Sequence, residues 1–66
     1  MEFKKFMAAI TGIASQQKIV PKFRHDKEHG IYIAYFPNNI RMTGNSLSKK
    51  ITVKWGNSHC SEFEIV

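Results

Sequence analysis

The first eighteen residues carry apolar side chains at helical spacing. The large apolar residues recur at intervals of three and four positions, at Phe3, Phe6, Met7, Ile10 and Ile13. This spacing places them on one face of a helix, with mainly polar residues on the other. Because the residue before a proline is pushed out of the helical conformation, Pro21 limits the segment. We therefore predict one amphipathic helix from Glu2 to about Lys18.

After Pro21 the pattern changes to alternation and short apolar runs, which are typical of β-strands. It predicts three strands, at Lys22–His25, Ile31–Phe36 and Ile40–Thr43. The polar segment 26–30 and the triplet 37–39 are rich in turn-forming residues and separate the three strands. The segment 44–48 breaks the pattern again.

The last third of the chain predicts a hairpin with a defined register. A three-residue loop at 56–58 places the apolar residues on one face, by pairing Trp55 with His59, Val53 with Ser61 and Ile51 with Phe63. On the other face it pairs Lys50 with Glu64, Thr52 with Glu62 and Lys54 with Cys60. Opposite charges across a strand pair contribute roughly a few tenths of a kcal/mol, so they support this register. We expect Trp55 to belong to the core.

The elements together predict an α+β fold, with one N-terminal amphipathic helix packed on one face of a four- to five-stranded antiparallel sheet. Sixty-six residues, 42% of them hydrophobic, suffice for a single small domain spanning 1–66. The single cysteine excludes an internal disulfide, and no segment approaches the roughly 20 apolar residues of a membrane helix. We expect a cytoplasmic protein that needs no cofactor and has no membrane partner.

The chain is basic, with ten lysine and arginine residues against five aspartate and glutamate residues. A sheet covered by one helix leaves its other face open. If Ile31, Ile33 and Tyr35 face the helix, then Tyr32 and Phe36 lie outward among cations. Small sheets bind single-stranded nucleic acid by stacking bases on aromatic rings and holding phosphates with cations. The sequence thus predicts a non-catalytic nucleic-acid-binding module that uses Arg24, Tyr32, Phe36, Arg41, Lys50 and Lys54.

Two alternatives remain open at this point. One buries the strand 31–36 on both sides, with Tyr32 and Phe36 in a second small core under the 44–48 loop. The other is a protein-interaction module, such as an inhibitor or accessory protein of the kind phages and mobile elements encode. It would bind an acidic protein surface through the basic face or a sheet edge. Because no proline or lysine guards the C-terminal segment 63–66, that segment could also pair with its own copy in a homodimer.

The three histidines are the candidates for catalysis or metal binding. His25 and His29 are four residues apart, but in a turn rather than on a helix, so their spacing does not favour zinc. His59 and Cys60 are adjacent in a strand and would point to opposite faces. If the protein were an enzyme, a metal-free ribonuclease using a histidine with Glu28 or Glu62 would suit these residues best, although no second catalytic partner is fixed.

One loop remains a candidate phosphate site. Gly44-Asn45-Ser46 is small and polar, and it lies between Arg41 and Lys49-Lys50 in the sequence. Its backbone N–H groups and the neighbouring cations could hold a phosphate. The loop lacks the spacing of a P-loop.

Overall fold

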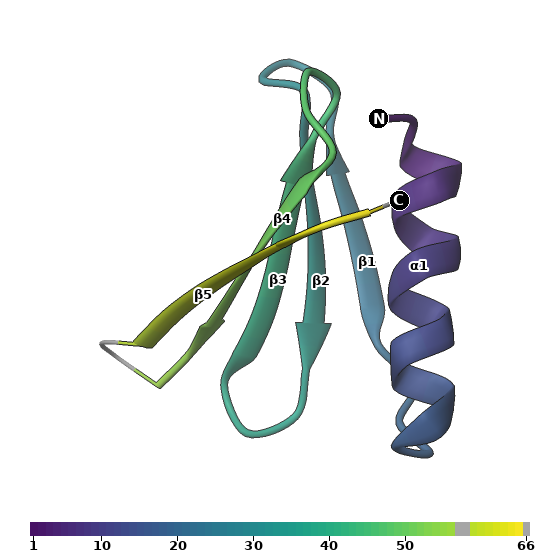
Figure 1. The fold of residues 1–66 in the computed structure, drawn as a ribbon, viewed down its shortest axis with the longest axis vertical. Coiled ribbons are helices and arrows are strands. Elements are labelled where there is room, and N and C mark those ends of the chain that lie inside the picture. The colour runs from purple at the N-terminus through teal and green to yellow at the C-terminus, as the bar shows by residue number, and fades with distance from the viewer. Residues whose placement is uncertain (57–58, 66) are drawn as a thin grey trace.

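The protein is described by a computed structural model that covers residues 1–56 and 59–65, with only the backbone at 59 and 60. One helix precedes five strands: α1 (Phe3–Gln16), β1 (Lys22–Asp26), β2 (Ile31–Phe36), β3 (Ile40–Asn45), β4 (Lys50–Trp55) and β5 (His59–Glu64). The strands pair antiparallel in the order β1-β2-β3-β4-β5. Figure 1 shows α1 beside a strongly twisted sheet. The α+β fold predicted from the sequence is confirmed.

Helix α1 buries a stripe that repeats every fourth residue, Phe6, Ile10 and Ala14. It ends earlier than predicted, at Gln16, because Lys18 adopts a left-handed conformation with a φ of 56°. The N–H of Lys18 donates to the carbonyl of Ser15 at 3.2 Å, and the N–H of Ile19 donates to the carbonyl of Ala14 at 3.0 Å. These two bonds form a Schellman motif, so the helix is closed by its own backbone before the chain reaches Pro21.

The strands follow the predicted segments, with β1 one residue longer and β3 two residues longer at their C-terminal ends. Turn residues take the left-handed conformation where the chain reverses, at Gly30, Asn38, Asn39 and Gly56. The predicted register of the last hairpin is confirmed, from Trp55 opposite His59 to Lys50 opposite Glu64. Its loop residues Asn57 and Ser58 lie outside the described residues. In the described part of the chain, no helix has the length and hydrophobicity to span a membrane.

The core lies between α1 and the helix-facing side of β2, β3 and β4. Its buried members are Phe6, Ile10, Tyr32, Ala34 and Ile51, surrounded by half-buried apolar side chains. The Tyr32 hydroxyl donates a hydrogen bond of 2.8 Å to the carbonyl of Met1. Gly44, opposite Tyr32 in the sheet, lies directly against the ring of Phe6. By its register Trp55 lies on the helix-facing side of the sheet, but the expectation that it belongs to the core is wrong, because 39% of its surface is exposed and it is not part of the core cluster.

The predicted orientation of β2 is wrong. Tyr32 is only 3% exposed, and its ring lies 5.2 Å from that of Phe3 and 5.5 Å from that of Phe6 between centroids. Phe36 packs against the same core. Both therefore face the helix, and the alternative of a second core under the 44–48 loop is also wrong. The side of β2 that the helix leaves open carries Ile31, Ile33 and Tyr35.

Candidate nucleic-acid interface

The sheet face opposite α1 presents side chains in rows that cross the strands. Residues that pair across an antiparallel sheet point to the same side. One such row holds three cations around one aromatic ring, because Lys22 pairs with Tyr35, Tyr35 with Arg41, and Arg41 with Lys54. We call these four residues the basic row. Its three cations are exposed and the tyrosine is half-buried.

A second row runs beside the basic row, one step along each strand. We call it the middle row, and it consists of Arg24, Ile33, Thr43, Thr52 and Glu62. The third row, at the end of the sheet near the β1–β2 turn, contains Asp26, Ile31 and Asn45 in β1 to β3 and Lys50 with Glu64 in β4 and β5. Ile31 is 38% exposed there.

The four predicted cationic site residues all belong to this open face. Arg41 and Lys54 lie in the basic row, Arg24 lies in the middle row, and Lys50 lies in the third row. All four are exposed. The structure therefore brings together Arg41 and Lys54, which are paired, and places Arg24 and Lys50 in the other two rows. It adds Lys22, which the sequence analysis did not select.

The aromatic part of the predicted site is corrected. Tyr32 and Phe36 are on the helix-facing side, and the ring that lies among the cations is that of Tyr35. The segment 31–36 has large apolar residues at both parities, so its alternation does not tell which side is covered. A usable signal lay in β1. A four-residue turn at 27–30 pairs Arg24 with Ile33. Because the charged side chain of Arg24 should face solvent, its partner Ile33 should lie on the same open face, and so should Tyr35 two residues further on.

An open hollow lies at the end of the sheet beside the basic row. It has a volume of about 410 Å³ and is lined by Tyr35, Phe36, Asn39, Ile40, Arg41 and Gly56. Tyr35 and Arg41 thus border both the open face and this hollow.

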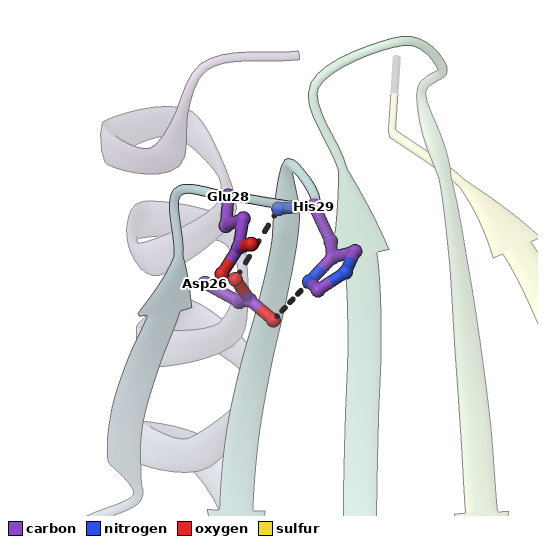
Figure 2. A group of neighbouring side chains, drawn as sticks. All are labelled: Asp26, Glu28 and His29. Atoms are coloured by element: carbon purple, nitrogen blue, oxygen red, sulfur yellow. Dashed lines mark hydrogen bonds and ion pairs between the residues drawn. The ribbon is translucent and has the colours of Figure 1, made fainter.

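The β1–β2 turn holds the one group of potential metal ligands in the described residues. Asp26, Glu28 and His29 each place one ligand atom within 4.8 Å of the others, and Figure 2 shows all three on the same turn. The Asp26 carboxylate accepts the His29 N–H at 3.2 Å and bonds His29 Nδ1 at 2.9 Å. The hydrogen bond from the His29 side chain, followed by that from its backbone, lowers the pKa of Asp26 below its usual value of 3.8. These bonds close the turn, which explains the cluster without a metal.

His25 and His29 make their contacts in different parts of the fold. His25 points toward the helix, where its ring stacks on Phe3 at 4.6 Å and meets the edge of Tyr32 at 4.9 Å between centroids. His29 instead lies in the turn with Asp26. The backbone of His59 lies opposite Trp55, at the other end of the strands. Positions 25, 29 and 59 therefore do not converge on one site, and the side chains of His59 and Cys60 lie outside the described residues.

The candidate phosphate loop is not free to bind a phosphate with its backbone. Gly44 and Asn45 belong to β3 rather than to a loop. The Asn45 side-chain oxygen accepts the N–H groups of Leu47 at 2.8 Å and Ser48 at 2.9 Å. The Ser46 N–H donates to the carbonyl of Gly30 at 3.1 Å. The Ser46 N–H thus joins the β3–β4 loop to the β1–β2 turn, and the N–H groups of Leu47 and Ser48 are already bonded within the loop.

Comparison of the chain with protein-family models, with curated proteins and with solved structures finds no match.

Proposed function

We propose that the protein is a non-catalytic module that binds single-stranded nucleic acid on the open face of its sheet. The observation that carries this proposal is the basic row, in which Tyr35 lies between Lys22 and Arg41. Lysine and arginine neutralise phosphates, and an aromatic ring on a sheet offers a flat surface to a base. The faces of bases are accessible in a single strand, whereas in a duplex they are stacked on one another. The combination of cations and an aromatic ring therefore favours a single strand as the ligand.

The composition of the open face supports a ligand with both flat apolar and anionic parts. In β2 this face presents Ile31, Ile33 and Tyr35, and the strands beside it present Arg24 and Arg41. An acidic protein surface would match the cations, but it gives no reason for an aromatic ring between Lys22 and Arg41. Nucleic acid supplies phosphates for the cations and bases for the aromatic ring.

The test is fluorescence-anisotropy binding of labelled single-stranded DNA and RNA, with a duplex of the same sequence, at about 50 and 200 mM salt. We expect wild-type binding to single strands that weakens with salt. Tyr35→Ala should remove one stacked base, worth about 1–3 kcal/mol, or roughly a 5- to 150-fold loss of affinity. Tyr35→Phe keeps the flat ring and should bind nearly as well as the wild type.

Two controls distinguish the loss of affinity caused by removing the Tyr35 ring from the effects of a lower net charge and of unfolding. Lys4→Ala removes an exposed cation on α1, away from the sheet, and should change affinity little. Circular dichroism of Tyr35→Ala shows whether the half-buried side chain can be removed with the fold intact. No binding of the wild type at 50 mM salt, or equal affinity of Tyr35→Ala and Tyr35→Phe, contradicts the proposal.

The alternative function, protein binding, rests on a different feature of the sheet. In the described part of the chain β5 pairs with β4 alone, so it is an edge strand that another strand could extend. A partner bound there would be insensitive to Tyr35→Ala. Failure of nucleic-acid binding would make this edge the next surface to test, with sedimentation of the purified protein to detect a homodimer.

A further inference from the structure

We propose that the bound single strand crosses the β-strands along the basic row, at the end of the sheet away from the β1–β2 turn, and covers about four nucleotides. The inference rests on the proposed function and adds the path and the length of the ligand. Its basis is the distribution of charge over the open face. The charge changes sign from one end of the strands to the other.

The three rows differ in charge in a regular order. The basic row has three cations and no acid; the middle row has one cation, Arg24, and one acid, Glu62; and the third row has one cation, Lys50, against Asp26 and Glu64. The net charges are thus +3, 0 and −1. A polyanion lying along the strands would pass from an attractive end to a repulsive end. A polyanion lying across them stays over the three cations throughout.

The separation of the rows makes Lys50 a weak contributor to such a path. Lys50 and Lys54 are four residues apart in one strand, which is about 13–14 Å at the rise of an antiparallel strand. The Debye length at 0.15 M salt is about 8 Å. Phosphates over the basic row are therefore screened from Lys50, which also faces Glu64 across the strand pair.

The length of the basic row sets the size of the site. From Lys22 to Lys54 the row makes three steps between neighbouring strands, or roughly 14 Å at about 4.8 Å per step. One strand of duplex DNA rises about 3.4 Å per nucleotide, the closest spacing of stacked bases, so this length holds at most about four nucleotides. Tyr35 is the second member of the row, so one base stacks on it while the phosphates on both sides reach Lys22 and Arg41.

The experiment compares two lysines on the same face of the same strand. Affinities of wild type, Lys54→Ala and Lys50→Ala for oligo-dT and oligo-rU of two to ten nucleotides are measured between about 50 and 200 mM salt. With three phosphate contacts the wild-type slope of log affinity against log salt should be about −2.1, since each contact on a single strand contributes about −0.7. Lys54→Ala should reduce the slope to about −1.4, and Lys50→Ala should leave it at −2.1.

The length series tests the path independently. Affinity, corrected for the number of overlapping positions on each oligonucleotide, should rise to about four nucleotides and then level off. Equal loss in Lys50→Ala and Lys54→Ala, or affinity that keeps rising to ten nucleotides, would overturn the path while leaving the proposed function in place. A wild-type protein that binds no oligonucleotide would overturn the proposed function itself. Thermal unfolding of both variants confirms that these exposed side chains can be removed without loss of the fold.

Discussion

Gly44 is a position where adding one methyl group should lift α1 from the sheet. A Cβ at Gly44 would lie 2.9 Å from Cδ1 and 3.1 Å from Cε1 of Phe6, and 3.1 Å from Cε of Met1. Carbon atoms in contact prefer about 3.5–4.0 Å. The ring would have to retreat by roughly half an ångström or more, yet Phe6 is fully buried and packed against Phe23 and Tyr32. We expect Gly44→Ala to separate helix and sheet locally.

The expected loss follows from two opposing effects. Overpacking of a core costs about 1–3 kcal/mol. Gly44 does not have a positive φ, so alanine adopts its backbone conformation and gains about 0.4–1 kcal/mol by restricting the unfolded chain. Taken at mid-range, about 2 against about 0.7 kcal/mol, the two effects leave a net destabilisation of about 1.3 kcal/mol, out of roughly 3–10 kcal/mol for a domain of this length. Each kcal/mol lowers the Tm of such a domain by about 4–8 °C.

Urea unfolding followed by circular dichroism measures this loss, and Gly12 provides the matched control. A Cβ at Gly12 meets nothing within 4 Å, and the residue is exposed within α1. Gly12→Ala should therefore stabilise the protein, by up to about 1 kcal/mol. Replacing glycine by alanine should therefore lower the free energy of unfolding at position 44 and raise it at position 12.

Replacing the obstructing ring tests the cause of the effect. In a Phe6→Leu background the smaller side chain leaves room for the methyl group, so Gly44→Ala should cost less than it does in the wild type. An unchanged urea midpoint in Gly44→Ala, or an equal cost of Gly44→Ala with Phe6 and with Leu at position 6, would show that the ring of Phe6 does not obstruct the added methyl group.

Two further predictions concern the polar contacts that hold the turn and the start of the chain. Tyr32→Phe removes the hydroxyl that donates to the Met1 carbonyl and should cost about 0.5–1.5 kcal/mol by urea unfolding, whereas an unchanged midpoint would show that this bond contributes nothing. The lowered pKa of Asp26 means that its contribution to stability is present above pH 3.8 and is lost as the pH falls through the lower folded value. Asp26→Asn should therefore be less stable than wild type at pH 7 and approach it below pH 3.8; a gap that stays constant from pH 7 to pH 2.5 would contradict this.

The parts of the fold that could be predicted from the sequence are those in which each segment has one apolar side. In α1 the spacing of Phe6 and Ile10 admits one orientation, and both are buried. In the last hairpin Ile51 and Val53 alternate with the polar residues Lys50, Thr52 and Lys54, and the predicted register is confirmed. In both cases reversing the face would have buried charges, which is costly enough to exclude the alternative.

The orientation of β2 could not be predicted in the same way, because the strand is apolar on both sides. Reversing it exchanges Tyr32, Ala34 and Phe36 for Ile31, Ile33 and Tyr35, and neither set contains a charge. The choice depends on fit in three dimensions. Ala34 and Gly44 leave room for α1 to approach, and the Tyr32 hydroxyl finds an acceptor at Met1. These contacts join residues far apart in the sequence, so a pattern within six residues does not contain them.

The side of β2 that the core does not use is the strongest functional signal in the molecule. Every open-face residue of β1, β3 and β4 is charged or carries a hydroxyl or amide, as expected for a solvated sheet surface, whereas β2 places Ile31, Ile33 and Tyr35 there. Packing against α1 does not require these three side chains, because the other face of β2 supplies Tyr32 and Ala34 to the core. Solubility would favour polar residues in their place. An apolar stripe on the open face, with Tyr35 between two exposed cations, therefore supports the proposed binding of flat bases and phosphates, and the proposal depends on Tyr35 above all.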